Sequence, residues 1–141
     1  MKKSGPPLPS AMFLADTSFI VSPFAKTASR RKWAQAFFEK HKGRLWTTAA
    51  AFTEASHLIG EPATAAKILA DYNFLVDLQA DKFALAILLE KYAPEMDFAD
   101  ATLVRASELC PNFKILTDDQ HFEWYRRSQG RERIPVHWIP S

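Results

Sequence analysis

The chain has 141 residues, of which 48% are hydrophobic and 24% are charged, and 18 Lys and Arg against 16 Asp and Glu give a formal charge of +2. A chain of this length folds as one domain and buries about 68–70% of its unfolded surface, so it needs no disulfide or structural metal. Cys110 is the single cysteine, which excludes a disulfide framework and predicts a reducing, cytoplasmic location.

The sequence also argues against two other kinds of protein. Its four glycines are scattered, so it has no Gly-rich loop of the kind that wraps a nucleotide phosphate. The longest apolar run, 83–89, spans seven residues, whereas a membrane-spanning helix needs about 20. Residues 1–10 have prolines where a signal peptide has an apolar core, so we expect a flexible lead-in there and a single domain over 11–141.

Strand and helix patterns alternate along the chain. Met12–Ala15 is a short apolar strand that ends in polar Asp16, Thr17 and Ser18. An amphipathic helix is expected over 28–42, a brief strand over 44–47, and an Ala-rich helix from Thr48 to about Gly60. Further helices are predicted from Pro62 through Tyr72 and over 81–92 and 98–109, and further strands over 74–78, 113–116 and 135–139. Long crossovers between strands predict an α/β fold with a mostly parallel sheet covered by helices.

Two aspartates follow predicted strands directly. Asp16 and Asp119 each lie just beyond an apolar strand, and ligands of open parallel sheets bind at the carboxyl ends of the strands. Either aspartate alone is equally well explained as the cap of a following helix. The two together favour a site where two carboxylates meet at one edge of the sheet.

Further acids lie on two predicted helices. Glu54 is the only Asp, Glu, Lys or Arg between Thr48 and Gly60, so we expect this helix to be buried nearly all round and Glu54 to need a cation or a proton as partner. Asp97 and Asp100 stand at the start of the helix over 98–109, where a cap and a first-turn acid are also favoured by the helix dipole alone.

Taken together, Asp16, Glu54, Asp100 and Asp119 offer oxygen ligands from four separate elements. Such oxygen donors suit Mg²⁺ or Mn²⁺. Ions of this kind bind a scissile phosphate and activate water in phosphodiester hydrolysis, which is the reaction we hypothesise.

Other constellations are weaker. Glu54 and His57 have the Glu-x-x-His spacing of di-iron bundles, but those sites need two copies of it. The four histidines do not have the spacing of a zinc site. Ser18 and Ser56 lack a recognisable Ser-His-Asp setting, although a triad is spatial and sequence alone leaves it open.

Four segments in order resemble the PIN domain, particularly the VapC-like proteins: Leu14–Ser18, Thr53–Leu58, Ala99–Val104 and Ile115–Phe122. The resemblance runs from about Met12 to the tail that includes 125–127 and 134–135. It implies a three-layer α/β/α sandwich and an endoribonuclease dependent on Mg²⁺ or Mn²⁺. Many such proteins are toxins of type II toxin–antitoxin pairs, so it also implies a homodimer and inhibition by an antitoxin.

The resemblance places the family's acidic residues on Asp16, Glu54, Asp100 and Asp119. Asp118 is an alternative for the last of them, and Asp97 matches a further acid seen in part of the family. Small hydroxyl side chains beside the carboxylates would orient them; they are Thr17, Ser18 and Thr117.

The sequence supports an RNA partner through two basic groups, 30–32 and the arginines at 126, 127, 131 and 133, and through Trp124 and Tyr125, which could stack on bases. Solvated helix faces and a core aromatic explain the same residues equally well. Two other functions remain open: a catalytically weak PIN-like module that binds RNA or a protein, and a nuclease that acts on DNA or on a particular structure.

Overall fold

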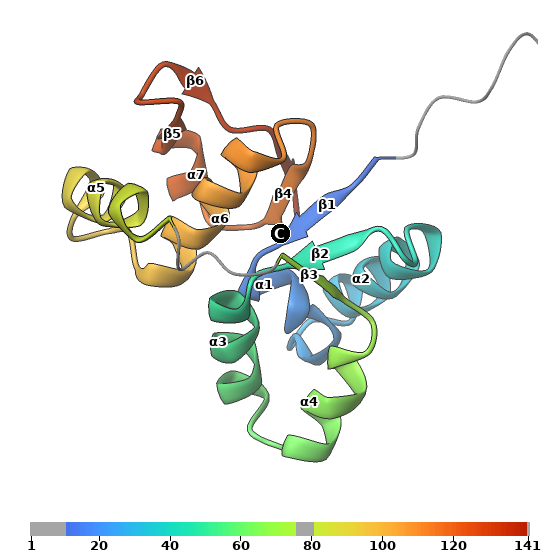
Figure 1. The fold of residues 1–141 in the computed structure, drawn as a ribbon. Coiled ribbons are helices and arrows are strands. Elements are labelled where there is room, and N and C mark those ends of the chain that lie inside the picture. Colours follow the sequence, from blue (N-terminus) through green and yellow to red (C-terminus); the bar gives the residue numbers. More distant parts are fainter. Residues whose placement is uncertain (1–10, 76–80, 141) are drawn as a thin grey trace, which may run out of the picture.

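A five-stranded, fully parallel sheet forms the centre of the computed structural model, which describes residues 11–75 and 81–140. β1 (Phe13–Ala15) lies in the middle and pairs with β2 (Leu45–Thr47) on one side and β4 (Lys114–Thr117) on the other (Figure 1). β3 (Asn73–Phe74) and β7 (Val136–Trp138) form the edges. The predicted lead-in over 1–10 and the end of the predicted strand over 74–78 lie outside the described residues.

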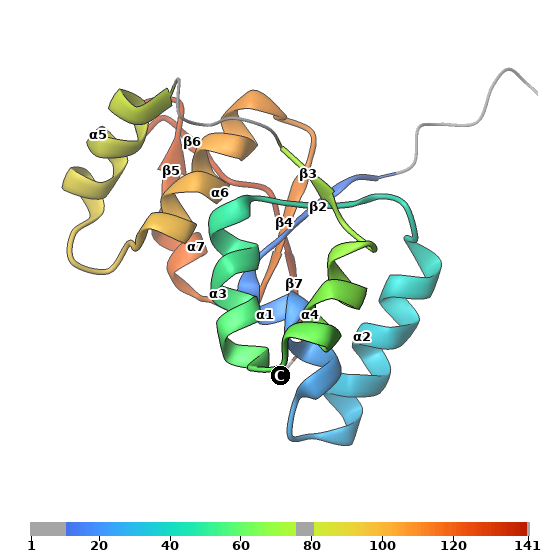
Figure 2. The ribbon, with the colours of Figure 1, turned by 60° about the horizontal axis from the view of Figure 1, so that its bottom comes forward.

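Helices cover both faces of the sheet (Figures 1 and 2). One face packs against α1 (Thr17–Ile20) and α2 (Ala28–Lys40), with α4 (Pro62–Leu69) beside them. The other face packs against α5 (Lys82–Tyr92) and α6 (Phe98–Leu109). The predicted three-layer α/β/α architecture is therefore confirmed.

Alternation along β1 explains why both layers are needed. Leu14 packs into the core that contains α5 and α6, whereas Phe13 and Ala15 pack into the core that contains α1 and α2. All three side chains are buried, as expected for a central strand covered on both faces. α3 (Ala49–Ile59) contributes Ala51 to the first core and Ala55 to the second.

Helix ends follow the sequence signals closely. α6 spans the predicted residues because Asp97 caps it and forms a reciprocal capping box with Asp100. α3 begins after Thr48, whose hydroxyl accepts from Ala51 N, and ends at Gly60, which has a φ of 74°. α2 ends at Lys40, two residues before the predicted end at 42.

Several short elements have no counterpart in the prediction. They are α1, the 3₁₀ helix Ser22–Phe24, α7 (His121–Trp124) and a hairpin of β5 (Arg126–Arg127) with β6 (Glu132–Arg133). α1 and α7 directly follow the sheet edge where Asp16 and Asp119 lie, so both predicted loops continue as a helical turn. Among residues 11–75 and 81–140, no helix combines the length and the apolar character needed to cross a membrane.

Candidate active site

Asp16 lies at the carboxyl end of β1 and is buried. Its Oδ1 accepts from Thr17 N at 2.8 Å, which makes it the cap of α1, and its Oδ2 accepts from the Thr117 hydroxyl at 2.6 Å. Ser18 Oγ lies 3.4 Å from the same Oδ2. The helix cap and the candidate site residue are thus one side chain, held by the first turn of α1 and by the end of β4.

Glu54 reaches the same region from α3. The Thr17 hydroxyl lies 3.1 Å from Glu54 Oε1 and 3.1 Å from Ala51 O, so it links α1 to α3. The expectation that this helix is buried nearly all round is wrong, because Glu54, His57 and Leu58 are exposed and only Ala51 and Ala55 are buried. The lack of charged residues in this helix reflects its many small side chains and does not mean that the helix is buried.

Asp100 enters from the first turn of α6 and is 8% exposed. Its Oδ2 accepts from Asp97 N at 3.3 Å and from the Tyr125 hydroxyl at 3.1 Å. Asp97 is itself exposed, and its Oδ1 accepts from Asp100 N at 2.8 Å. The capping explanation for both residues is therefore confirmed, and it also fixes the orientation of the Asp100 carboxyl.

Asp118 and Asp119 differ in their partners. Asp118 pairs with Arg30 of α2, with Oδ2 2.8 Å from Nη1. Asp119 turns the other way: its backbone N donates to Thr117 Oγ1, and its Oδ1 lies 2.9 Å from His121 Nδ1. Asp119 also interacts electrostatically with Asp16 and Asp100. Asp119 thus belongs to the acidic group by position, whereas an arginine neutralises Asp118.

Crowding of these acids changes their titration. Burial raises the pKa of Asp16 to about 6, against hydrogen bonds from Thr117 and Thr17 that lower it, with Asp119 and Glu54 raising it further. Burial, then repulsion from Asp97, Asp16 and Asp119, raises the pKa of Asp100 to about 7, although the backbone N–H of Asp97 opposes this shift. A cation bound beside these carboxyl groups would favour their ionised form, so the group is suited to cation binding.

Divalent cations fit this acidic group by donor chemistry. Asp16, Glu54, Asp100 and Asp119 supply only carboxylate oxygens, which Mg²⁺ and Mn²⁺ prefer. Within 11–75 and 81–140, however, no three acidic, His or Cys side chains converge tightly enough to hold a metal ion by themselves. The carboxylates interact electrostatically without forming a closed cage.

Two side chains of this region were not anticipated as part of it. Of the two explanations for Tyr125, a base-stacking residue or a core aromatic, the structure supports the core aromatic, because Tyr125 is completely buried and its hydroxyl contacts Asp100. His121 contacts Asp119 and stacks on the Tyr125 ring, with the two ring centroids 6.1 Å apart. The motif around 115–122 contains His121, but no sequence spacing signals the bond between Tyr125 and Asp100. Trp124, by contrast, is exposed enough to stack on a base.

The fold has a counterpart among solved structures. No protein-family model and no curated protein matches the sequence. A crystal structure of Mycobacterium tuberculosis VapC20, described as a sarcin–ricin loop cleaving toxin, superposes with a TM-score of 0.58 at 16% sequence identity, covering 73% of this chain and 86% of that chain. With its parallel sheet between two helical layers, this chain has a VapC-like PIN fold.

Proposed function

We propose that this protein is an endoribonuclease dependent on Mg²⁺ or Mn²⁺ and the toxin of a type II toxin–antitoxin pair. The observation that carries the proposal is the pair of buried aspartates, Asp16 and Asp100, whose pKa values are raised next to Asp119 at the carboxyl edge of the sheet. The likeness of the fold to a VapC toxin supports the same conclusion.

In this proposal Asp16, Glu54, Asp100 and Asp119 hold the cation, and Asp97 is a candidate for a more distant contact. A divalent cation supplies charge neutralisation at the scissile phosphate and lowers the pKa of a bound water. Thr117 and the Thr17 backbone orient the two oxygens of Asp16, while Tyr125 and the Asp97 backbone orient Asp100. Thr17 orients Glu54, and Ser18 stands beside Asp16.

The test is cleavage of RNA by the purified chain with Mn²⁺, with Mg²⁺ and with EDTA. We expect cleavage only with metal, and a loss of more than about 100-fold in Asp16→Asn and Asp100→Asn, because ligand loss exceeds the 10–100-fold typical of supporting residues. Asp118→Asn is the matched control for Asp119→Asn, since Asp118 is paired with Arg30. Equal loss in these two variants would count against Asp119 as the fourth acid.

A catalytically weak module that binds RNA or protein is the second candidate, and one finding favours it: no three ligating side chains among residues 11–75 and 81–140 converge. It predicts RNA binding without cleavage and no response to Mn²⁺. Cleavage of DNA but not RNA would instead support the DNA nuclease alternative.

The proposed partners are an antitoxin and a second copy of the chain. Expression of the protein alone in bacteria is expected to arrest growth, and co-expression of the neighbouring reading frame is expected to relieve the arrest. Growth arrest by the Asp16→Asn variant as strong as that by the parent would contradict a toxic nuclease activity.

A further inference from the structure

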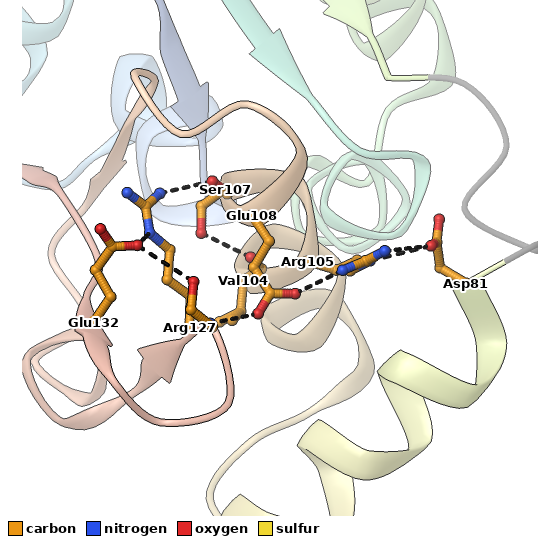
Figure 3. Close-up of polar contacts among 8 residues, drawn as sticks. Asp81, Val104, Arg105, Ser107, Glu108, Arg127 and Glu132 are labelled. Carbon is orange, nitrogen blue, oxygen red and sulfur yellow. Dashed lines mark hydrogen bonds and ion pairs between the residues drawn. The ribbon is translucent and has the colours of Figure 1, made fainter.

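A pocket separate from the acidic group lies where α5 and α6 meet the β5–β6 hairpin. Its volume is about 550 Å³, within the range of small-ligand sites. Arg105 and Glu108 of α6 form one wall, and the arginine bonds to Asp81 and Glu108 there (Figure 3). None of the acidic residues proposed to hold the cation lines this pocket.

Besides Arg105, three cations of the described residues line this pocket: Lys91, Arg126 and Arg131. None of them forms an ion pair with a carboxylate of residues 11–75 or 81–140. Glu108, the acid among the lining residues described, is already engaged by Arg105 and by the backbone N of Ser128. The pocket therefore carries a net positive charge, which attracts an anion.

One of these cations, Arg126, is held in position by hydrogen bonds, and Lys91 lies close to the hairpin. Arg126 Nη1 donates to the carbonyl oxygens of residues 123, 124 and 125, at 2.6, 3.1 and 3.1 Å, which fixes its charge without neutralising it. Lys91 Nζ reaches across to the hairpin, where Gly130 leaves room because a Cβ there would lie 2.5 Å from Nζ. A fixed charge loses little side-chain entropy when it binds an anion.

The opposite wall is apolar, formed by Ala84, Ile87 and Leu88 of α5. The hairpin turn also lines the pocket and holds Ser128 and Gln129 at positive φ, 56° and 61°. Non-glycine residues in this region are strained, and such strain gathers at ligand sites. An apolar wall opposite fixed cations suits a ligand with a flat apolar part and an anionic part, which describes a nucleotide.

The pocket is also joined to the acidic group by direct contacts. Tyr125 donates to Asp100, and the next residue, Arg126, donates from its backbone N to the Tyr92 hydroxyl at 3.0 Å, beside Lys91. Along α6, Arg105 lies five residues after Asp100, which is a rise of about 7–8 Å along the helix axis. A strand bound at the acidic group would reach the pocket within a few nucleotides.

We infer that this pocket binds a flanking nucleotide of the single-stranded RNA whose cleavage is proposed above, with its phosphate on Lys91, Arg126 and Arg131 and its base or ribose against Ile87. The inference rests on the proposed function for its choice of ligand. It goes further by naming a binding site separate from the reacting phosphate.

The test measures binding of a fluorescently labelled single-stranded RNA to the full chain in EDTA, by anisotropy over a range of salt concentrations. Lys91→Gln/Arg131→Gln is expected to weaken binding about tenfold and to flatten the plot of log K against log[salt] by about 0.7, since the one phosphate bound in the pocket contributes about 0.7 on a single strand. Ile87→Ser is expected to weaken binding several-fold and leave the slope unchanged, because it removes no charge.

The matched control is Lys40→Gln/Lys67→Gln, which removes two exposed lysines on α2 and α4 and should change affinity less than twofold. Equal effects of the two double variants, or no binding by the parent, would overturn the inference. A labelled acidic peptide is a second probe: if Lys91→Gln/Arg131→Gln no longer bound this peptide but bound RNA as the parent does, the pocket would be a peptide site and the inference would be overturned. The readout needs no cleavage, so a parent that binds RNA here without cutting it would refute the proposed function alone.

Discussion

Asp16 and Asp100 make the folded chain respond to pH. Burial raises both pKa values above the ordinary 3.8, to about 6 and about 7. The folded state therefore holds these protons more tightly than the unfolded chain, and the stability they contribute is complete below pH 4 and lost as pH rises through 6 and 7. Without metal, the protein should be more stable at pH 5 than at pH 8.

Asp100→Asn should remove most of this dependence. One pKa unit corresponds to about 1.4 kcal/mol, and after allowance for solvent and for the altered cap we expect a gain of about 2 kcal/mol at pH 8 in EDTA. At pH 4 the gain should vanish, because Asp100 is then already neutral. Urea unfolding of parent and variant at both pH values measures this. A variant less stable than the parent at pH 8 would show that the Asp100 charge does not destabilise the folded state.

Tyr125 is a positioning residue for Asp100. Its pKa is raised well above the ordinary value by burial and by Asp100, so its hydroxyl stays protonated and donates. Tyr125→Phe keeps the ring and should lower stability by about 1 kcal/mol and metal-dependent RNA cleavage by about 10–100-fold.

Tyr92→Phe provides the matched control for that variant. It also removes one hydroxyl from a buried tyrosine, but that hydroxyl accepts from Arg126 N and bonds to no carboxylate of the residues that the structure describes. A similar loss of stability with cleavage within about twofold of the parent is expected. Equal losses of cleavage in the two variants would assign Tyr125 a packing role only.

At the scale of elements, a buried arginine fastens the hairpin to the end of α6. Arg127 is 5% exposed and donates to Ser107 O at 2.6 Å and to Glu132 at 2.8 Å (Figure 3). It also donates to Pro111 O at 3.1 Å. Ser107 O is one of the last carbonyls of α6, which have no partner inside the helix. Arg127 therefore caps this helix from another element.

Arg127→Met should lower the free energy of unfolding by about 3 kcal/mol, because it leaves buried carbonyls and Glu132 without their donor. Arg127→Lys should recover only part of this loss, since an ammonium lacks the guanidinium fork. Arg133→Met is the control: Arg133 pairs with Glu123 on the surface, and such pairs contribute about 0–1 kcal/mol. Chemical denaturation compares them, and equal losses for Arg127→Met and Arg133→Met would contradict the capping role.

Long elements were predictable because their signals are local. The bounds of α6 follow from Asp97 and those of α3 from Thr48 and Gly60, each of which acts within one helical turn. The four-residue helices α1 and α7 are shorter than the period that reveals an amphipathic helix, so sequence periodicity could not find them. The exposure of α3 and the contact of Tyr125 with Asp100 have no local sequence signal, because both depend on which elements pack together.

At the scale of the molecule, the α5–α6 layer exposes apolar side chains that monomers rarely leave in contact with water. Phe83 of α5 is 75% exposed. Phe98 is 55% exposed and lines an apolar groove of about 470 Å³ between α3, α5 and α6. Clustered exposed apolar surface marks association sites. The groove is lined by Leu75, Leu85 and Leu89 among others. In a two-fold symmetric dimer, each copy would cover the groove of the other and bury the exposed phenylalanines of both copies.

We therefore expect a dimer in light scattering coupled to size exclusion, and a monomer for Phe83→Asp, because a buried unpaired carboxylate costs several kcal/mol at an interface. Phe24→Asp is the matched control, since Phe24 is 51% exposed but lies in the 3₁₀ helix beside α2, in the opposite layer. Far-UV circular dichroism should be unchanged in both variants, so that loss of the dimer is separated from unfolding. A dimer that survives Phe83→Asp but not Phe24→Asp would move the interface to the α2 layer, and a monomeric parent would exclude a stable homodimer through either face.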